Sequence, residues 1–376
     1  MMTKPPVPTG EYAVGTLTYT VKNDREDVLC PPAMRSVAAR VYYPVLKESV
    51  AGLEKAHHIT RNIATALKKV FFLPVNYDKL EAAGKNVSEC YPDAPRIPGK
   101  KFPLVIFNHG YFSYREGNSF LCIELASHGY VVISVAHSFE ALCAEFDDGT
   151  SIFYDKRLSH KTYEPFWRGV IKLLKLVKQK GTNEELAQKF DDFQDVYCKF
   201  QKGRVPEWVK DTNAALNYAK ENLADLIDFE KGIGASGHSF GGDTSYALCA
   251  SNPDFACGIN IDGALFGDYR NTVQTKPFMQ ISCKANENVV TRVYVKHTKP
   301  VTKVIFRDMS HMGFSDMKHM ISMKSSVGKL GADEMHENLC KCHLEFFDTW
   351  LKKAKPHPEL TSNDVITVTE YAPDLT

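Results

Sequence analysis

The apolar residues in the middle and C-terminal parts of the chain gather in short, almost continuous runs separated by longer amphipathic stretches. Two clear runs are Phe102–Phe107 and Tyr130–Val135. Runs of this length and composition are typical of strands buried on both faces of a parallel sheet. The same pattern predicts four further strands, which are the stretch that begins at Lys231, Ala256–Asp262, Pro277–Ser282 and Val301–Phe306.

The N-terminal part of the chain has an alternating pattern instead. Glu11–Val21 and Val37–Pro44 are rich in β-branched and aromatic residues, and a proline closes the second segment. Alternation with these residue types predicts strands that bury one face. We therefore expect a hairpin at one edge of the sheet, which brings the number of predicted strands to eight.

Amphipathic segments between the runs predict helices. Ser119–His128 lies between two predicted strands, and Asp333–Lys352 follows the last one. Alternation of strand, helix and strand implies right-handed crossovers and helices on both faces of the sheet. We expect an α/β fold with a mostly parallel, eight-stranded sheet, and a polar, weakly patterned tail over Pro356–Thr376.

The segment between the fourth and fifth predicted strands is too long for an ordinary crossover. It holds a predicted hairpin at Glu145–Phe153 with an Asp-Gly turn, and three predicted helices at Pro165–Lys180, Asn183–Phe200 and Pro206–Leu226. We expect one domain over residues 1–376 with a helical insertion at 138–230. Such an insertion can roof a site or be peripheral.

A second amphipathic segment lies before the first buried strand. Apolar residues at Ile59, Ile63, Leu67 and Val70 recur at helical spacing within Gly52–Val70, which is predicted to be helical. Two interpretations stay open. The apolar face, extended by Phe71 and Phe72 and flanked by Lys68 and Lys69, either packs on the body of the protein or touches a lipid surface.

The fifth predicted strand ends in a candidate nucleophile. Gly237-His238-Ser239-Phe240-Gly241 fits the Gly-x-Ser-x-Gly elbow, in which a sharp turn between strand and helix exposes a serine hydroxyl. The glycines allow backbone and neighbouring elements to approach closely. A strand before the motif and a helix after it favour the elbow of an α/β-hydrolase fold over a structural Gly-Ser turn.

A serine nucleophile needs a histidine base and an acid to orient that base, and in this fold they follow in the order serine, acid, histidine. Asp262 ends the strand after the elbow unit and is the predicted acid, ahead of Asp254 and Asp268. His311 lies in the loop after the last buried strand and is the predicted base. Its nearest rival, His319, falls on a helix predicted to start near Ser315.

The oxyanion of an acyl-transfer intermediate requires two backbone N–H donors. In α/β-hydrolases these belong to the residue after the nucleophile and to a loop after an earlier strand. The predicted donors are Phe240 and Tyr111, the second of which follows His109-Gly110.

The charge composition indicates which kinds of partner this protein can bind. Lys and Arg total 46 and Asp and Glu total 45, so a net charge of +1 gives no electrostatic basis for binding nucleic acid. The substrate is expected to be a small-molecule or phospholipid ester, with peripheral membrane contact and oligomeric state left open.

The ten cysteines form no CxxC pair and are expected to be reduced, mostly buried thiols. Cys340-Lys-Cys342-His343 lies on a predicted helix that points the two thiols to different sides, so no metal is assigned and no cofactor is expected. Because no stretch has the length of a signal peptide or a membrane span, we expect a cytoplasmic protein.

Several of these motifs occur together in a known family. With Phe107–Tyr111, Leu125–Val131, Gly237–Gly242, Cys257–Asp262 and Ser310-His311 in place, the chain resembles the plasma and type II platelet-activating factor acetylhydrolases from about Gly10 to Lys352. The gap of 23 residues between Ser239 and Asp262 (262 minus 239) is part of the resemblance.

The resemblance implies calcium-independent hydrolysis of short or oxidised sn-2 acyl groups of phospholipids. Ser239, Asp262 and His311 would form the triad, with Tyr111 and Phe240 as oxyanion donors. Similar motifs also occur in bacterial polyester hydrolases and dienelactone-hydrolase-like esterases. A soluble short-chain esterase and a hydrolase-like scaffold that only binds a ligand therefore stay open as alternatives.

Overall fold

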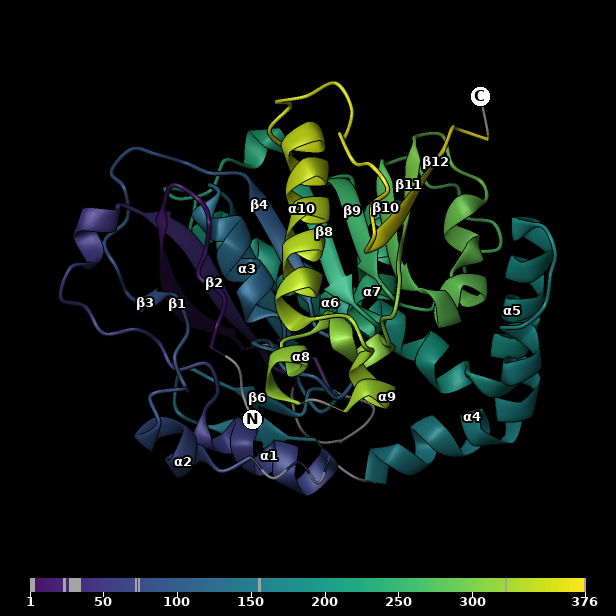
Figure 1. Cartoon of the computed structure of the whole chain (residues 1–376), viewed down its shortest axis with the longest axis horizontal. Helices are drawn as coiled ribbons and strands as arrows, with labels where there is room; N and C mark the ends of the chain where they lie inside the picture. Colours follow the sequence, from purple (N-terminus) through teal and green to yellow (C-terminus); the bar gives the residue numbers. More distant parts are fainter. Residues whose placement is uncertain are drawn as a thin grey trace.

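The computed structural model describes residues 4–22, 25–26, 35–71, 73, 75–154, 157–321 and 323–374, with the backbone alone for 157–164. Its main feature is a ten-stranded sheet in the order β12-β11-β10-β9-β8-β4-β5-β2-β1-β3 (Figure 1). The strands are β1 (Ala13–Val21), β2 (Val37–Val45), β3 (Tyr91–Pro92), β4 (Leu104–Asn108), β5 (Val131–His137), β8 (Ile233–His238), β9 (Phe255–Ile261), β10 (Phe278–Cys283), β11 (Val301–Phe306) and β12 (Ile366–Tyr371).

The predicted α/β-hydrolase architecture is confirmed, and all eight predicted strands are present. The strands β5, β4, β8, β9, β10 and β11 run parallel to one another, while β1 and β2 form the expected antiparallel hairpin. The count of eight is wrong by two, because β3 pairs over two residues with β1 and β12 pairs antiparallel with β11. The C-terminal tail, which was expected to be polar and weakly patterned, therefore supplies an edge strand.

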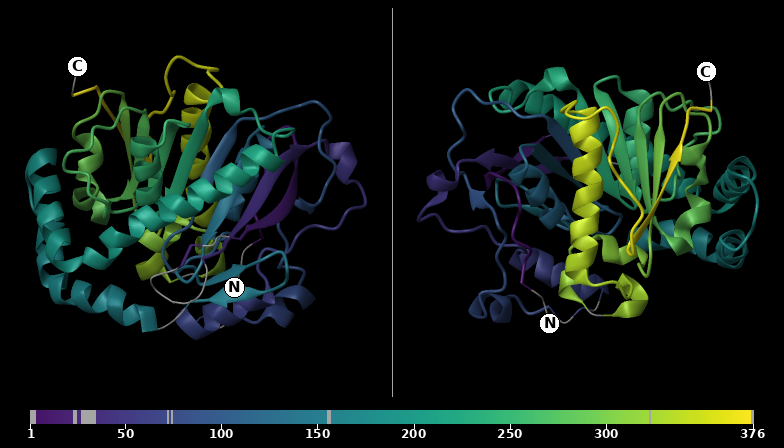
Figure 2. Two further views of the ribbon diagram at one scale, coloured as in Figure 1. Left: turned by 180° about the vertical axis from the view of Figure 1, so that it is seen from behind. Right: turned by 45° about the horizontal axis from the view of Figure 1, so that its top comes forward.

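Alternating side chains of the central strands build a core on each face of the sheet. In β4, Leu104 and Ile106 belong to one cluster, which the helices α6 (Lys199–Asn222) and α7 (Phe240–Ser251) complete. Val105 and Phe107 belong to the other, which α3 (Ser119–Ser127) and α10 (Ala332–Trp350) complete. Figure 1 shows α10 in front of the sheet and Figure 2 shows α6 crossing the opposite face.

The segment between β5 and β8 contains a hairpin and three helices. The hairpin pairs β6 (Cys143–Glu145) with β7 (Ser151–Phe153), and the helices are α4 (Arg157–Leu176), α5 (Asn183–Tyr197) and α6. The predicted starts at Pro165 and Pro206 are wrong, since both prolines lie inside longer helices. Proline favours the first turn of a helix, but here the helical backbone continues before it.

The helix predicted from Gly52 begins only at Arg61. Residues 52–60 are not helical, and α1 spans Arg61–Phe71. Ile63 and Leu67 are buried with Tyr114 and Leu142. The apolar face of α1 therefore packs on the body of the protein, and Phe72 lies outside the described residues.

Three short helices complete the described part of the chain. They are α2 (Tyr77–Ala82), α8 (Met317–Met320) and α9 (Lys324–Val327). Among the described helices, none has the length and apolar character needed to cross a bilayer. The nine described cysteines are free and buried, and Cys30 lies outside the described residues.

Candidate active site

The turn between β8 and α7 holds Ser239 in a strained backbone conformation with φ of 56°. Non-glycine residues seldom adopt a positive φ, and such strain is typical of nucleophile turns. The flanking glycines are required by space. A Cβ on Gly237 would lie 2.2 Å from the carbonyl oxygen of Gly241, and one on Gly241 would lie 2.0 Å from that of Asn108. The sequence can therefore close this turn only with glycine at both positions.

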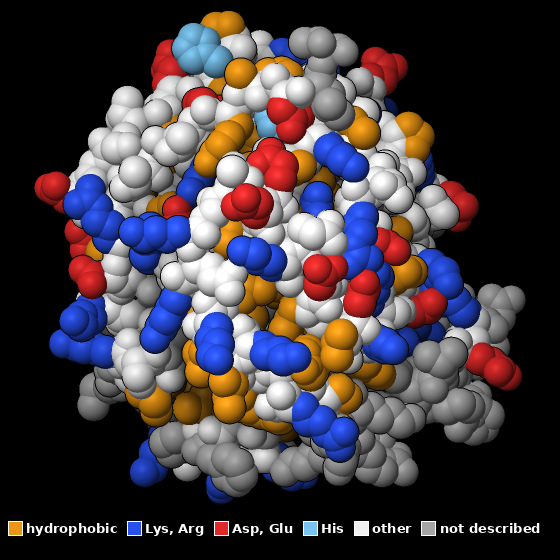
Figure 3. Space-filling view, turned by 90° about the vertical axis from the view of Figure 1, so that its right-hand side faces the viewer, with side chains coloured by type: hydrophobic (Ala, Val, Ile, Leu, Met, Phe, Trp, Pro, Cys, Tyr) orange, Lys and Arg blue, Asp and Glu red, His pale blue; other side chains and the backbone are white. Residues whose placement is uncertain are grey.

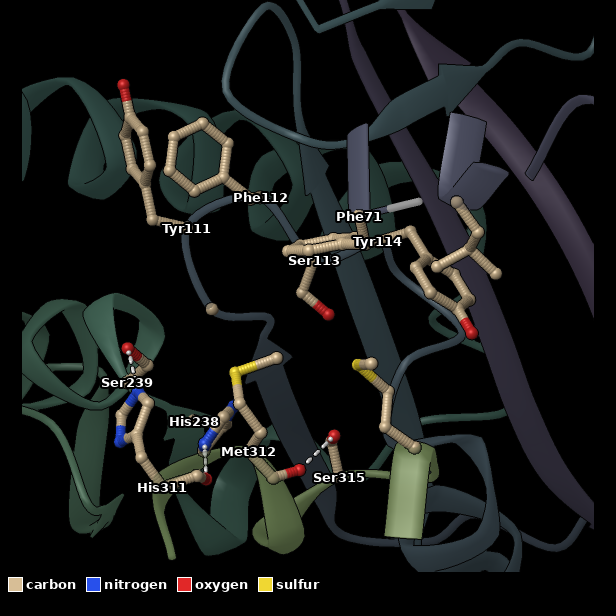
Figure 4. A pocket seen from close by; sticks show the side chains of 13 residues that line it. Phe71, Tyr111, Phe112, Ser113, Tyr114, His238, Ser239, His311, Met312 and Ser315 are labelled. Carbon is tan, nitrogen blue, oxygen red and sulfur yellow. Dashed lines mark hydrogen bonds between the residues drawn. The ribbon is translucent and has the colours of Figure 1, made fainter. Parts of the chain in front are cut away.

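Ser239, His311 and Asp262 form a chain of hydrogen bonds. Ser239 Oγ lies 2.8 Å from His311 Nε2 (Figure 4). His311 Nδ1 lies 2.7 Å from Asp262 Oδ2. His311 begins a short 3₁₀ helix after β11, and Asp262 directly follows β9 with φ of 56°. A carboxylate can only accept hydrogen bonds, so Nδ1–H donates to Asp262 and Nε2 is left to accept from the serine hydroxyl.

The rival residues lie elsewhere. Asp254 pairs with Lys220 at 2.6 Å, and Asp268 lies 3.5 Å from Lys202. His319 is buried on α8, where its ring meets those of Phe120 and His336. The structure thus brings together the three residues predicted as nucleophile, acid and base, and it places the alternatives in other contacts.

Side chains that sequence reasoning missed hold the Asp262 carboxylate. Its Oδ1 accepts from the backbone N–H of Cys283 at 2.8 Å. Its Oδ2 accepts from the amide of Asn286 at 2.7 Å and faces the Cys283 thiol at 3.4 Å, in addition to His311. Because the carboxylate is buried and every contact is a donor, its orientation toward His311 is fixed.

The loop after β4 lies against the nucleophile turn. A Cβ on Gly110 would come within 3.0 Å of Ser239 Cβ, so the backbone of Tyr111 follows directly beside the serine. Phe240 is the first residue of α7, where the N–H has no acceptor within the helix. The rings of Tyr111 and Phe240 meet edge to face at 5.7 Å. The two predicted oxyanion donors therefore both adjoin Ser239.

A buried polar network lies beneath this loop. Asp211 of α6 contacts Arg35 Nη2 at 2.7 Å and His137 Nδ1 at 3.0 Å. The other nitrogen of His137 lies 3.1 Å from Asn108 Oδ1, next to the loop. Burial opposes ionisation of Asp211, but Arg35 and His137 outweigh it and hold the pKa of this carboxyl well below its usual range. Burial also lowers the pKa of His137, against the opposing effect of Asp211.

The same network reaches the loop backbone through Glu140. Its carboxylate pairs with Arg35 at 2.9 Å and with Arg204 at 2.7 Å, and its carbonyl oxygen accepts from the N–H of Phe112 at 3.1 Å. Phe112 itself has φ of 61°. Insertion helix α6 thus supports the loop that carries Tyr111 through buried charged pairs.

A second histidine lies beside the candidate base. The His238 ring is 4.8 Å from that of His311, and its Nε2 donates to the His311 carbonyl oxygen at 3.0 Å. Burial, followed by the neighbouring His311, lowers the pKa of His238 to about 3. His238 therefore stays neutral and anchors the His311 backbone. Its position inside the elbow motif was the one signal that could have revealed it.

A small cavity of about 30 Å³ opens beside Ser239. Figure 4 shows Ser113 and Phe71 on one side of it and Met312 and Ser315 on the other. Further lining residues include Leu67, Tyr114 and Met317. A site of this volume holds about two water molecules. Helix α1 therefore provides a wall of the cavity through Leu67 and Phe71.

Cys340 and His343 each contact another side chain of the protein. His343 Nε2 lies 3.0 Å from Ser236 Oγ, and Cys340 Sγ contacts His336. Over the described ranges, no group of three or more His, Cys, Asp or Glu side chains is arranged to hold a metal ion.

Comparison with known proteins identifies the family. The model of the family "Platelet-activating factor acetylhydrolase, isoform II" matches residues 2–336. A platelet-activating factor acetylhydrolase of Cavia porcellus is 25% identical over 270 residues, which are 69% of this chain and 60% of that protein. One of Gallus gallus is 29% identical over 207 residues, 47% of this chain and 43% of that protein. The match thus spans less than two thirds of either relative.

A solved structure shares the fold. A ferulic acid esterase from Streptomyces cinnamoneus superposes with a TM-score of 0.74 at 19% identity, covering 98% of this chain and 100% of that one. At this identity the likeness establishes the α/β-hydrolase fold. The family match extends from residue 2 through the elbow, Asp262 and His311 to residue 336, and it establishes the family as well as the fold. This chain belongs to the platelet-activating factor acetylhydrolase isoform II family.

Proposed function

We propose that this protein is a serine ester hydrolase that removes short acyl groups, acetyl above all, from phospholipid-like esters through an acyl-enzyme. The observation that carries the proposal is the hydrogen-bonded chain Ser239–His311–Asp262 at 2.8 Å and 2.7 Å, set on a strained turn beside a small cavity. This arrangement is the one that activates a serine hydroxyl in acyl transfer.

In the first half of the reaction, Ser239 Oγ attacks the ester carbonyl carbon while His311 Nε2 takes the hydroxyl proton. The N–H groups of Tyr111 and Phe240 stabilise the oxyanion of the tetrahedral intermediate. Asp262 stabilises the imidazolium that forms. As the intermediate collapses, the bond to the alcohol oxygen breaks, and His311 returns the proton to the leaving alcohol.

In the second half, water attacks the acyl-enzyme. His311 takes a proton from the water, the same two N–H groups hold the oxyanion, and collapse releases the carboxylic acid and restores the Ser239 hydroxyl. The half-exposed His311 side chain can be reached by water.

The cavity supports a short acyl chain. Its volume of about 30 Å³ fits a group of about acetyl size, and Phe71, Leu67 and Met317 are among the apolar side chains that line it. A longer acyl chain would need α1 to move. The similarity to platelet-activating factor acetylhydrolases supports an acetylated phospholipid as the source of that group.

A cytoplasmic location is part of the proposal. It is supported by the nine described cysteines, which are buried and free rather than paired. Thiols persist in reducing compartments, whereas secreted proteins commonly carry disulfides.

Labelling with a fluorophosphonate probe, together with hydrolysis of acetyl, butyryl and octanoyl aryl esters and of an acetylated ether phospholipid, tests the proposal. The wild-type protein should label at one site and prefer the acetyl ester, and Ser239→Ala should lose both labelling and turnover. If the protein hydrolyses the aryl acetate but not the phospholipid, it is a soluble short-chain esterase instead. If the folded wild-type protein does not label, it is a scaffold that only binds a ligand.

A further inference from the structure

Helix α4 has two apolar faces, of which one is uncovered. Phe166, Leu173 and Val177 pack against the core, as its amphipathic sequence predicts. Leu174 lies on the other side, with Trp167 and Ile171. These three side chains are 62% (Trp167), 67% (Ile171) and 56% (Leu174) exposed. Their spacing of four and three residues aligns them in one row, here called the α4 stripe.

Basic side chains flank the α4 stripe. Lys172 and Lys175 are exposed on α4, Lys178 is exposed in the turn just after it, and residues 165–180 contain no acidic residue. Figure 3 shows the side of the molecule that carries α4 and α5, where apolar side chains lie among Lys and Arg, with Asp and Glu side chains on the same face. The stripe is therefore an apolar row whose nearest charged neighbours along the chain are lysines.

The neighbouring helix extends this surface. A groove of about 270 Å³ runs between α4 and α5, and Val196 on its α5 side is 61% exposed. Two acidic residues of α5 near the groove are paired with two cations, since Arg270 lies 3.3 Å from Asp192 and 2.6 Å from Asp195, and Lys202 lies 3.0 Å from Asp195. Their charge is largely compensated, so the lysines of α4 dominate the field beside the stripe.

Such a surface matches the chemistry of a lipid interface. Tryptophan favours the boundary between headgroups and acyl chains, and leucine and isoleucine enter the acyl region. Lysines on the same helix reach the headgroups and are attracted to anionic lipid. We propose that the α4 stripe docks this protein on the surface of a bilayer that contains anionic lipid.

Docking at this face would also orient the catalytic centre. Helices α1 and α4 lie at the same end of the molecule in both views, and α1 lines the cavity beside Ser239 (Figures 1 and 2). A bilayer in contact with α4 would thus lie near the cavity. This consequence rests on the proposed function, whereas the docking itself concerns binding alone.

Vesicle binding tests the docking without reference to activity. The probes are vesicles of phosphatidylcholine with phosphatidylserine, and of phosphatidylcholine alone, in flotation and tryptophan fluorescence measurements. The wild-type protein should float with the mixed vesicles, shift the emission of Trp167 to the blue, and bind at least tenfold more weakly to pure phosphatidylcholine or in high salt. Ile171→Asp and Leu174→Asp should each reduce binding at least tenfold, and Lys175→Glu with Lys178→Glu should remove the preference for phosphatidylserine.

Leu53→Asp is the matched control, because Leu53 is 43% exposed and belongs to a different part of the surface. It should change vesicle binding less than twofold. All four variants should hydrolyse a soluble aryl acetate as the wild type does, so a failure of docking is distinguishable from a failure of the proposed chemistry. The proposal is overturned if the wild type does not bind mixed vesicles, if Leu174→Asp binds as wild type, or if Leu174→Asp instead abolishes self-association of the protein.

Discussion

Two aspartate–histidine pairs lie on either side of the loop that carries Tyr111. In the first, His311 Nδ1 is 2.7 Å from Asp262, and in the second, His137 Nδ1 is 3.0 Å from Asp211. The two pairs have similar geometry and both aspartates are buried. They differ in what the second imidazole nitrogen meets. His311 Nε2 contacts the Ser239 hydroxyl beside the cavity, while His137 Nε2 contacts Asn108 in the interior.

An Asp–His pair acquires a chemical role through its third partner and its access to substrate. The His311 side chain is 38% exposed, and that of His137 is fully buried. Arg35 compensates the charge of Asp211, whereas Asp262 has neutral donors from Cys283 and Asn286 besides His311. The first pair is therefore built to shift a proton, and the second is built to hold the loop in place.

The largest expected effect comes from Asp262→Asn. The asparagine can occupy the same space but favours the wrong tautomer of His311, which costs about four orders of magnitude in kcat in a serine protease with the same chain of residues. We expect a loss of roughly 10⁴-fold in kcat/KM for an aryl acetate and an unchanged circular dichroism spectrum. Near wild-type turnover of Asp262→Asn, with an inactive Asp268→Asn, would contradict the assignment.

Asp211→Asn should act on stability instead. Arg35 and Arg25 both contact the buried Asp211 carboxylate, and removing one member of a buried charged pair costs about 3–5 kcal/mol. Because Glu140 still pairs with Arg35, we expect a loss at the lower end of this range. Urea unfolding should show this loss in the free energy of unfolding, and the protein that remains folded should keep more activity than Asp262→Asn. If Asp211→Asn is as stable as the wild type but inactive, the His137–Asp211 pair has a catalytic role and this assignment is wrong.

The buried histidines next to the second pair should make the protein sensitive to acid. Burial, and then the neighbouring His137, lower the pKa of His109 to about 3. An unfolded chain binds this proton near pH 6.5 and the folded one does not, so the free energy of unfolding should fall as pH decreases from about 6.5 toward 3. For one such histidine the loss between pH 7 and 5 is on the order of 2 kcal/mol.

Urea unfolding at pH 7, 6 and 5 measures this effect. His109→Gln should lower the slope of stability against pH by roughly 2 kcal/mol over that interval, whatever its effect at pH 7. His311→Gln is the control variant. It removes a half-exposed histidine instead of a buried one, and catalytic activity is lost with it. An identical slope in wild type and His109→Gln would show that His109 does not carry the acid sensitivity.

Much of the fold could be predicted because its signal is local. Runs such as Phe102–Phe107 are apolar on both faces, and that pattern is visible within six residues. Strand β12 was missed because an edge strand buries little, and its polar Thr and Glu positions resemble a tail. The stretch 52–60 was wrongly predicted to be helical, since its apolar residues serve a loop that packs through Ile59.

The residues of the site also fall into those that local sequence patterns predict and those that they do not. Ser239, Asp262 and His311 could each be placed at a strand end, because parallel strands bring their carboxyl ends to one edge. Asn286 and Asp211 could not, because their roles depend on side-chain contacts across elements that no short pattern encodes. The position of His238 inside the elbow motif was a signal, but its contact with the His311 carbonyl oxygen could not be predicted from that motif. Asn286 lies 24 residues from Asp262 in the sequence, and Asp211 lies 74 from His137.

Asn286→Ala is expected to give the smallest effect of the four, and it tests whether the first pair depends on its support. The variant removes one donor from Asp262 Oδ2 and leaves the Cys283 N–H on Oδ1. A hydrogen bond to a charged group contributes about 1.5–3 kcal/mol, and because other donors remain, we expect about a tenfold loss in kcat/KM with little change in stability. The double variant Asn286→Ala with Asp262→Asn distinguishes positioning from a general structural role. If Asn286 acts through Asp262, its replacement should cost nothing further once the carboxylate is gone, whereas equal losses in both backgrounds would show that Asn286 acts independently of the pair.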